Sequence, residues 1–281
     1  MNQAGSPIAV RFAAEDAILP PTAGNLNVPN AARVYDALLG GKDNFAADRA
    51  VADQLAAAKP ALRHNVRANR AYLGRVVRYL ASEAGIRQFI DLGTGLPSLD
   101  NTHEVAQRAA LESRIVYVDN DPIVIAHARA MLISSSQGAT GYLRADIRDP
   151  GPILEQSART LDFEQPVAVL LLGVLHTIPA ADRPYDTVAA YLKAAAPGSY
   201  LAISHPASDI DAESAAKAAR QHDISLPGTQ TNRTRAEVSR FFDRLELVEP
   251  GVVRLDQWRP DPGDADPGVE ISCWAGLGRK H

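Results

Sequence analysis

Five short apolar runs, each separated from the next by a segment with helical periodicity, constrain the fold of this chain more than any other feature. They lie at residues 87–92, 114–119, 140–145, 167–172 and 199–204. Uninterrupted apolar runs of this length are typical of strands that are buried on both faces of a sheet. Strands that alternate with helices form parallel sheets with right-handed crossovers. The sequence therefore predicts an α/β fold.

Helix-start signals between these runs support the alternation. Asn101 and Thr234 are each followed three residues later by a glutamate, which is the spacing of a capping box. Asp121 precedes Pro122, and proline is favoured at the first helical position because its missing N–H would be unpaired there. Helices are therefore expected to begin at these points.

The chain before the first predicted strand reads as helical. Segments 31–39, 44–58 and 61–82 have helical periodicity. Gly40 and Gly41 separate the first two segments, since paired glycines favour a turn over a helix interior. A helical region therefore precedes the sheet.

Two strand-like runs close the chain, at 245–255 and 268–278. Because only a loop connects them, they predict a terminal antiparallel hairpin. These patterns divide the chain into an N-terminal arm at 1–28, a helical region at 29–85 and a sheet domain at 86–281.

Composition narrows the class of partner. The 281 residues carry a formal net charge of −4 and no basic run, so nucleic acid is not the expected partner. The single cysteine, Cys273, excludes an internal disulfide and a cysteine-rich metal site, and it fits a reducing cytoplasm. We see no signal peptide, no membrane-spanning apolar stretch and no convincing metal-ligand spacing. We therefore expect a cytoplasmic protein that binds neither a metal nor a membrane.

The segment QFIDLGTGLPS joins the first predicted strand to a glycine turn. The small residues Gly93 and Gly95 allow a ligand to approach the backbone closely. Asp119 ends the second strand, where a carboxylate can accept hydrogen bonds from both hydroxyls of a ribose. Asp146 and Ile147 follow the third strand, where they could hold an adenine by its amine and its ring face. The three strand ends predict a nucleoside site at the carboxyl edge of the sheet.

The end of the glycine loop, Pro97 and Ser98, indicates which kind of nucleoside ligand the site would bind. A dinucleotide site uses G-x-G-x-x-G to hold a pyrophosphate, but Ser98 stands at the third glycine position. The loop suits S-adenosylmethionine, which has no pyrophosphate. Two other interpretations stay open at this point. The chain could be an NAD-dependent oxidoreductase, or the glycines and aspartates could be ordinary turn and helix-cap residues.

The same residues resemble the class I S-adenosylmethionine-dependent methyltransferases, which share the loop DLGTG, the acidic strand end VYVDND and the segment ADIRDP. Within that class the chain closely resembles an actinobacterial family of predicted methyltransferases whose substrate is unassigned. The resemblance covers nearly the whole chain from about residue 28. It is carried most specifically by RVYDALLGGKDNFAADR at 33–49, and also by NRAYLGRVVRYLA at 69–81, VLHTIP at 174–179 and LVEPGVVRLDQWRPD at 247–261.

This resemblance implies a Rossmann-like sheet of seven strands with a terminal antiparallel hairpin, and an N-terminal helical cap at 29–85 over the cofactor pocket. It implies that S-adenosyl-L-methionine is the cofactor, with Tyr35 and Asn44 meeting its methionine tail or the substrate. The residues expected to bind the cofactor are Tyr35, Asn44, Arg70, Asp91, Gly93, Thr94, Gly95, Leu96, Asp119, Asn120, Asp146, Ile147 and Gly173.

Arg70 lies on the helix before the first strand and is expected to pair with the tail carboxylate. Its neighbours Arg67, Arg75 and Arg78 are expected to form mostly a solvated face.

His176, after the fourth strand, is the candidate catalytic residue, and His205, after the fifth, is a second candidate. A histidine at this edge could take a proton from a hydroxyl or amine nucleophile. Methyl transfer often needs no strong base, however, because the sulfonium is already activated and alignment supplies much of the rate. Thr229, Asn232 and Arg233 are candidates to border the substrate cavity.

The expected function is methyl transfer to a small organic molecule, with O- or N-methylation favoured over methylation of nucleic acid because the chain is acidic. A non-catalytic module that binds S-adenosylmethionine as a sensor or partner is the alternative from another class, and the oxidoreductase is the other alternative.

Overall fold

The computed structural model describes residues 26–98, 100–226, 228, 230–264 and 268–281. Residues 1–25, most of the expected arm at 1–28, lie outside the described part of the chain. The sheet has the strand order β3-β2-β1-β4-β5-β8-β6, and β7 pairs with β8 beside this path. Its strands are β1 Gln88–Leu92, β2 Arg114–Asp119, β3 Ala139–Arg144, β4 Ala168–Leu172, β5 Tyr200–Pro206, β6 Leu245–Leu247, β7 Val253–Arg254 and β8 Cys273–Lys280.

Strands β1 to β5 are parallel, and β8 runs antiparallel between β5 and β6. The five expected parallel strands and the antiparallel C-terminal strands are thus confirmed. The expected run at 245–255 is divided into β6 and β7, because Pro250 and the left-handed Gly251 turn the chain between them. The other expected run is shorter at its start, since β8 begins at Cys273 and not at residue 268.

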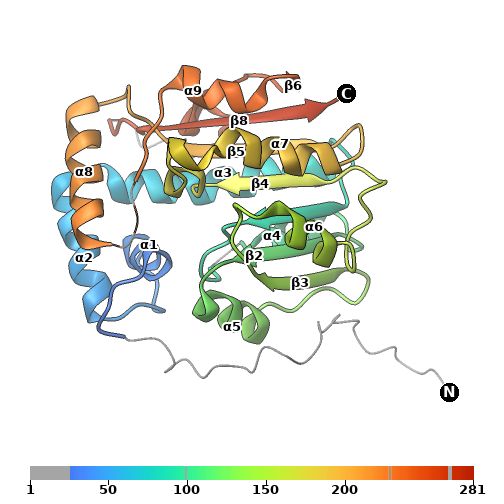
Figure 1. Ribbon diagram of the computed structural model, residues 1–281, viewed down its shortest axis with the longest axis horizontal. Coiled ribbons are helices and arrows are strands. Elements are labelled where there is room, and N and C mark those ends of the chain that lie inside the picture. The colour runs from blue at the N-terminus through green and yellow to red at the C-terminus, as the bar shows by residue number, and fades with distance from the viewer. Residues whose placement is uncertain (1–25, 99, 227, 229, 265–267) are drawn as a thin grey trace.

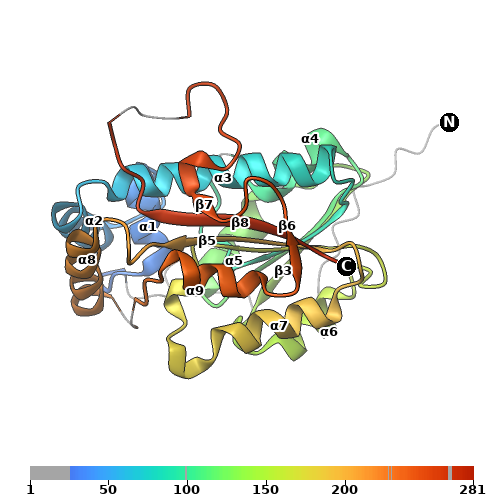
Figure 2. The same cartoon turned by 90° about the horizontal axis from the view of Figure 1, so that it is seen from above.

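Helices cover both faces of the sheet, with α3 and α4 on one side and α6, α7 and α9 on the other (Figure 2). The carboxyl ends of the parallel strands point toward α1, α2 and α8, which gather at one end of the molecule (Figure 1). The α-helices are α1 Ala31–Leu39, α2 Ala46–Ala58, α3 Leu62–Ser82, α4 Thr102–Ala109, α5 Pro122–Met131, α6 Pro150–Ser157, α7 Pro184–Ala194, α8 Ala212–Ser225 and α9 Arg235–Ser239. Short 3-10 turns lie at η2 Leu175–Thr177, η3 Ala180–Asp182, η4 Arg240–Phe242 and η5 Leu255–Gln257.

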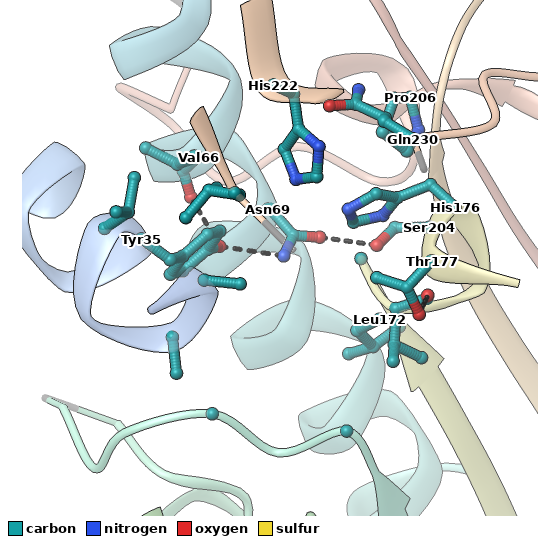
Figure 3. A pocket seen from close by; sticks show the side chains of 18 of the residues that line it. Tyr35, Val66, Asn69, Leu172, His176, Thr177, Ser204, Pro206, His222 and Gln230 are labelled. Carbon is teal, nitrogen blue, oxygen red and sulfur yellow. Dashed lines mark hydrogen bonds between the residues drawn. The ribbon is translucent and has the colours of Figure 1, made fainter. Parts of the chain in front are cut away.

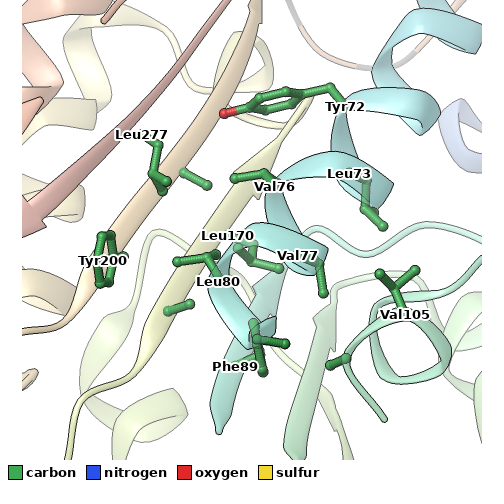
Figure 4. Packing of buried hydrophobic residues seen from close by; sticks show 14 of the residues in the cluster. Tyr72, Leu73, Val76, Val77, Leu80, Phe89, Val105, Leu170, Tyr200 and Leu277 are labelled. Atoms are coloured by element: carbon green, nitrogen blue, oxygen red, sulfur yellow. The ribbon is translucent and has the colours of Figure 1, made fainter. Parts of the chain in front are cut away.

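The core is divided by the sheet into two apolar layers, as strands buried on both faces require. Phe89 and Leu170 point to the layer under α3, together with Val76 and Leu80 of that helix (Figure 4). Ile90, the next residue of β1, points to the opposite layer. The alternation along one strand is the reason that its sequence is apolar throughout.

The expected capping boxes are confirmed at the starts of α4 and α9, and Asp121 caps α5 ahead of Pro122. Arg75 corrects the expectation of a solvated face on α3. It is 3% exposed and donates to the backbone carbonyls of Leu255 and Trp258, so it ties the C-terminal segment to the helix.

The two glycines after α1 have separate roles. Gly40 ends the helix in the left-handed conformation, at a φ of 82°. A Cβ on Gly41 would lie 2.0 Å from Oδ1 of Asp36, so only glycine fits there. Asp36 in turn accepts hydrogen bonds from the backbone N–H of Asp43 and the side chain of Asn44. These bonds fold the linker back on α1, and α2 therefore begins at Ala46, two residues later than expected.

Candidate functional site

A cavity of about 600 Å³ lies at the carboxyl ends of the parallel strands, beneath α1, α2 and α8. Open α/β sheets bind their ligands at this edge. The sequence-predicted residues that line the cavity are Tyr35, Arg70, Asp91, Gly93, Thr94, Gly95, Asp119, Asn120, Asp146, Ile147, Gly173, His176, His205 and Asn232.

Two of the expected cofactor residues do not line it. Leu96 is buried in the turn beyond the glycine loop. Asn44 lies within the helical cap, where its amide donates to Asp36 and to the carbonyl of Gly41, and its oxygen accepts from Arg49. Its side chain is therefore committed to holding the linker between α1 and α2.

The glycine loop uses its own N–H groups internally. The N–H groups of Gly93 and Thr94 donate to the carbonyl of Val118, at 2.8 and 3.2 Å, and that of Gly95 donates to Oδ2 of Asp119 at 2.9 Å. A Cβ on Gly93 would lie 2.3 Å from Val174, and the φ of Gly93 is 74°. The loop therefore shapes a close wall and anchors Asp119, but these three N–H groups do not point at a ligand.

The N-terminus of α4 is likewise occupied by the chain itself. The side-chain oxygen of Asn101 accepts from the N–H of Ser98 at 3.0 Å, and the Glu104 carboxylate accepts from the N–H of Asn101 at 2.8 Å. None of Ser98, Asn101 and Glu104 lines the cavity, so the start of α4 presents no N–H group to a phosphate held there. The residue at the third glycine position thus serves helix capping.

Two buried carboxylates face the cavity. Asp119 also accepts from the N–H of Asp121 at 3.0 Å, and burial raises its pKa. Asp91 accepts from the hydroxyl of Thr102 at 2.6 Å, and burial raises its pKa to about 6 despite that bond and the nearby Arg70. Both carboxylates retain lone pairs for ligand donors.

Asp146 is less free than the sequence suggested. Its two carboxylate oxygens accept from the guanidinium of Arg148, which also binds Asp182, and Arg148 lowers the pKa of Asp146. The pair is about half exposed and can rearrange. Ile147 is buried, and its carbonyl accepts from the hydroxyl of Tyr191 at 2.9 Å.

Asn69 joins the cap to the sheet across the cavity wall, and sequence reasoning missed it. Its amide donates to the hydroxyl of Tyr35 at 2.9 Å, and its oxygen accepts from the hydroxyl of Ser204 at 2.5 Å. Tyr35 donates onward to the carbonyl of Val66 (Figure 3). Gly173 makes room for Asn69, since a Cβ there would lie 3.2 Å from the amide nitrogen. Only the position of Asn69 inside NRAYLGRVVRYLA could have signalled this role.

His176 presents a neutral imidazole to the cavity. Burial lowers its pKa to about 3, with further lowering from His205 and His222. Its Nδ1 atom is buried and has no hydrogen-bond partner in the described part of the chain. The ring lies edge-on to His205, with the centroids 6.4 Å apart.

Arg233 holds the histidine loop from behind. It donates to the carbonyls of Leu175 and Ile178, which flank His176, and lies 2.7 Å from Nε2 of His205. Because arginine only donates, His205 accepts at Nε2 and carries its proton on Nδ1, which lies 2.9 Å from the carbonyl of Pro206. Of the loop candidates, Arg233 is thus buried behind the wall.

Of the other two loop candidates, Asn232 lines the cavity, and Thr229 lies outside the described residues.

The described residues contain no group of three or more His, Cys, Asp or Glu side chains placed to hold a metal ion. None of their helices is long and apolar enough to cross a membrane.

Comparisons with known proteins agree with this geometry. A family model described as S-adenosyl methyltransferase matches residues 21–281. The structure is similar to that of a DUF574 family protein from Streptomyces avermitilis, at 40% identity over 91% of this chain and 99% of that chain, with a TM-score of 0.88. It is also similar to a candidate methyltransferase from Thermobifida fusca, at 45% identity over 94% and 99%, with a TM-score of 0.84. No curated protein matches.

Proposed function

This chain belongs to the S-adenosyl methyltransferase family, and we propose that it transfers the methyl group of S-adenosyl-L-methionine to an oxygen or nitrogen of a small organic molecule. Family membership makes the chain an enzyme and S-adenosyl-L-methionine its methyl donor. The acceptor class and the residues that hold the two ligands are the proposal.

The residues along the sheet edge fit the donor in the order of its parts. Ile147 would pack on the adenine, and Asp119 would accept from the ribose hydroxyls, because its carboxylate is already fixed by Gly95 and Asp121. At β1, Asp91 and Arg70 would pair with the ammonium and the carboxylate of the tail. Such charge-assisted bonds are among the strongest available in a buried site.

His176 would orient the acceptor. The bound donor supplies an activated methyl group, so the chain has only to align a nucleophile with it. A neutral imidazole with an unpaired, buried Nδ1 atom accepts a hydrogen bond from a hydroxyl or an amine. A group with a pKa of about 3 is a weak base, so its contribution is orientation and exclusion of water.

One observation carries the proposal. At the same cavity, the N–H groups of Gly93, Thr94 and Gly95 are bonded within the protein, and the carboxylates of Asp91 and Asp119 are buried. It supports a cationic, phosphate-free nucleoside over NAD, because the capped start of α4 offers no place for a pyrophosphate. The unpaired polar atom of His176 in an open cavity supports an enzyme over a sensor.

Calorimetric titration with S-adenosylmethionine, S-adenosylhomocysteine and NAD tests this arrangement. We expect the adenosyl ligands to bind and NAD not to bind. The Asp119→Ala variant should bind them roughly 10- to 100-fold more weakly, because it loses charge-assisted hydrogen bonds. Asp186→Ala, which removes an exposed carboxylate on α7, is the matched control and should bind as wild type. Equal binding by both variants would contradict the placement of the ribose.

A further inference from the structure

The charged residues of the cavity are segregated along the sheet. The carboxylates among its described lining residues are Asp91, Asp119, Asp121 and Asp146, and they follow β1, β2 and β3. These strands form one side of the sheet. The opposite side, beyond β4, therefore has no lining carboxylate among the residues that the structure describes.

Lys59 lies on that opposite side. It directly follows α2 and is 4% exposed, and it lines the cavity. The groups close enough to raise its pKa are the thiol of Cys273 of β8 and the carboxylate of Asp211 at the start of α8, yet burial is the larger effect and lowers the pKa. No described carboxylate forms an ion pair with its ammonium group.

The methionine tail of the donor has its own cation. Arg70 acts on Asp91, at the β1 end of the cavity. Tyr35 lies between the two cations, since both Arg70 and Cys273 act on it. The groups that act on Lys59 belong to β8 and to the start of α8, and β4 and β5 lie between β1 and β8 in the sheet. Lys59 is therefore placed on the acceptor side of the methyl group.

The cavity lining around Lys59 is mostly apolar, and the carboxylate of Asp211 acts on the ammonium group from outside that lining. Leu55, Leu62 and Leu226 line this part of the cavity. His222 on α8 lies on the side of the cavity away from Leu172 (Figure 3), and its buried Nδ1 atom is 3.6 Å from Oδ1 of Asp223. An ammonium group in such surroundings is costly unless an anion accompanies it.

We propose that Lys59 is the counter-ion of a carboxylate on the methyl acceptor, so that the enzyme acts on small organic acids with an apolar body. The inference rests on the proposed function, since it assumes that this half of the cavity holds the acceptor. The carboxylate bonds to the ammonium group, and the apolar body lies against the leucines. The cavity of about 600 Å³ has to hold donor and acceptor together, which keeps the acid small.

Matched pairs of acids and amides test the proposal. Phenylacetate, hexanoate and benzoate, each beside its neutral amide, are titrated into protein saturated with S-adenosylhomocysteine, with ligand-observed NMR as the readout. We expect the wild-type protein to bind at least one acid roughly tenfold or more tightly than its amide, from one charge-assisted bond in a buried site.

Lys59→Met should abolish this preference and leave the affinity for S-adenosylhomocysteine unchanged. Methionine replaces an unpaired buried charge by an apolar chain of similar length, so the variant should melt no lower than wild type. Lys193→Met, which removes an exposed lysine on α7, is the control and should keep the preference.

Three outcomes would overturn the proposal. One is that no acid in the panel binds better than its amide, and another is that Lys59→Met keeps the preference. The third is that Lys59→Met weakens S-adenosylhomocysteine, which would place Lys59 at the donor. A protein that binds S-adenosylhomocysteine but prefers no acid refutes the role of Lys59 alone, whereas a protein that binds neither refutes the proposed function as well.

Discussion

The affinity for the donor should depend on pH through Asp91. Its pKa is about 6 in the ligand-free protein because the carboxyl is buried. About one tenth of the molecules therefore have an ionised Asp91 at pH 5, and about nine tenths at pH 7. If the ionised carboxylate pairs with the ammonium of the donor, the affinity for S-adenosylhomocysteine should rise about tenfold across this range, or by about 1.4 kcal/mol.

Calorimetry between pH 5 and 7 measures how the affinity for S-adenosylhomocysteine changes with pH, in a window where several other groups keep their protonation state. The amine of the ligand titrates at about 8 and its carboxyl at about 3.5, and both values lie outside this window. His176 and His205 have pKa values of about 3, so they stay neutral. Asp119 also has a raised pKa, so the Asp91→Asn variant is required. It should bind more weakly at pH 7 and show a flatter profile.

The sign for stability is opposite to that for binding. A carboxyl whose pKa is raised from 3.8 to about 6 by folding holds its proton more tightly in the native state. The free energy of unfolding of the ligand-free protein should therefore fall as the pH rises from about 4 to about 6, by up to about 3 kcal/mol from this group. A wild-type affinity that does not change between pH 5 and 7, or an Asp91→Asn variant with the full wild-type slope, would refute the reasoning.

Three further substitutions test the walls of the cavity, each by chemical denaturation together with donor binding. Gly93→Ala should lose at least about 1–3 kcal/mol, from its positive φ and from the clash with Val174; a loss near zero would contradict the geometry. Asn69→Leu should cost about 1–3 kcal/mol by leaving Ser204 without its acceptor, and adding Ser204→Ala should recover part of that loss. Asn30→Ala should cost about 1 kcal/mol as a lost N-cap and should speed donor release, since Asn30 also bonds to Asp121; an unchanged dissociation rate would count against that link.

The predictable parts of the site are those encoded by neighbouring residues. Strand ends follow from apolar runs, so Asp119 and Asp146 could be placed at one edge before any tertiary structure was known. Gly93 and Gly95 were predictable because their backbone requirement is local.

The parts that could not be predicted depend on contacts between distant segments. Asn69 and Lys59 lie in helical sequence without any local sign of which face meets the cavity. Arg75 carries the same charge as its exposed neighbour Arg78, and only the return of residues 255–258 to α3 makes it buried. Asn44 was predicted to meet a ligand, but its side-chain amide donates to Asp36, and this contact could not be foreseen from the local sequence.

The motif at 33–49 has a structural explanation that links the cap to the cofactor site. Arg33 forms a buried ion pair with Asp48 at 2.9 Å, and Asp48 also accepts from the N–H groups of Asn30 and Phe45. These bonds hold the cap together, while Val34, Tyr35 and Leu38 of the same motif line the cavity.

Asn30 carries the effect of this cap to the sheet. Its side chain caps α1 and donates to Asp121, the N-cap of α5, whose own N–H is held by Asp119. The residue proposed to bind the ribose is therefore positioned from one side by the glycine loop and from the other by the cap. Because a single chain of hydrogen bonds joins them, ordering of the cap and of Asp119 should occur together, and a donor that bonds to Asp119 should stabilise the cap that covers it.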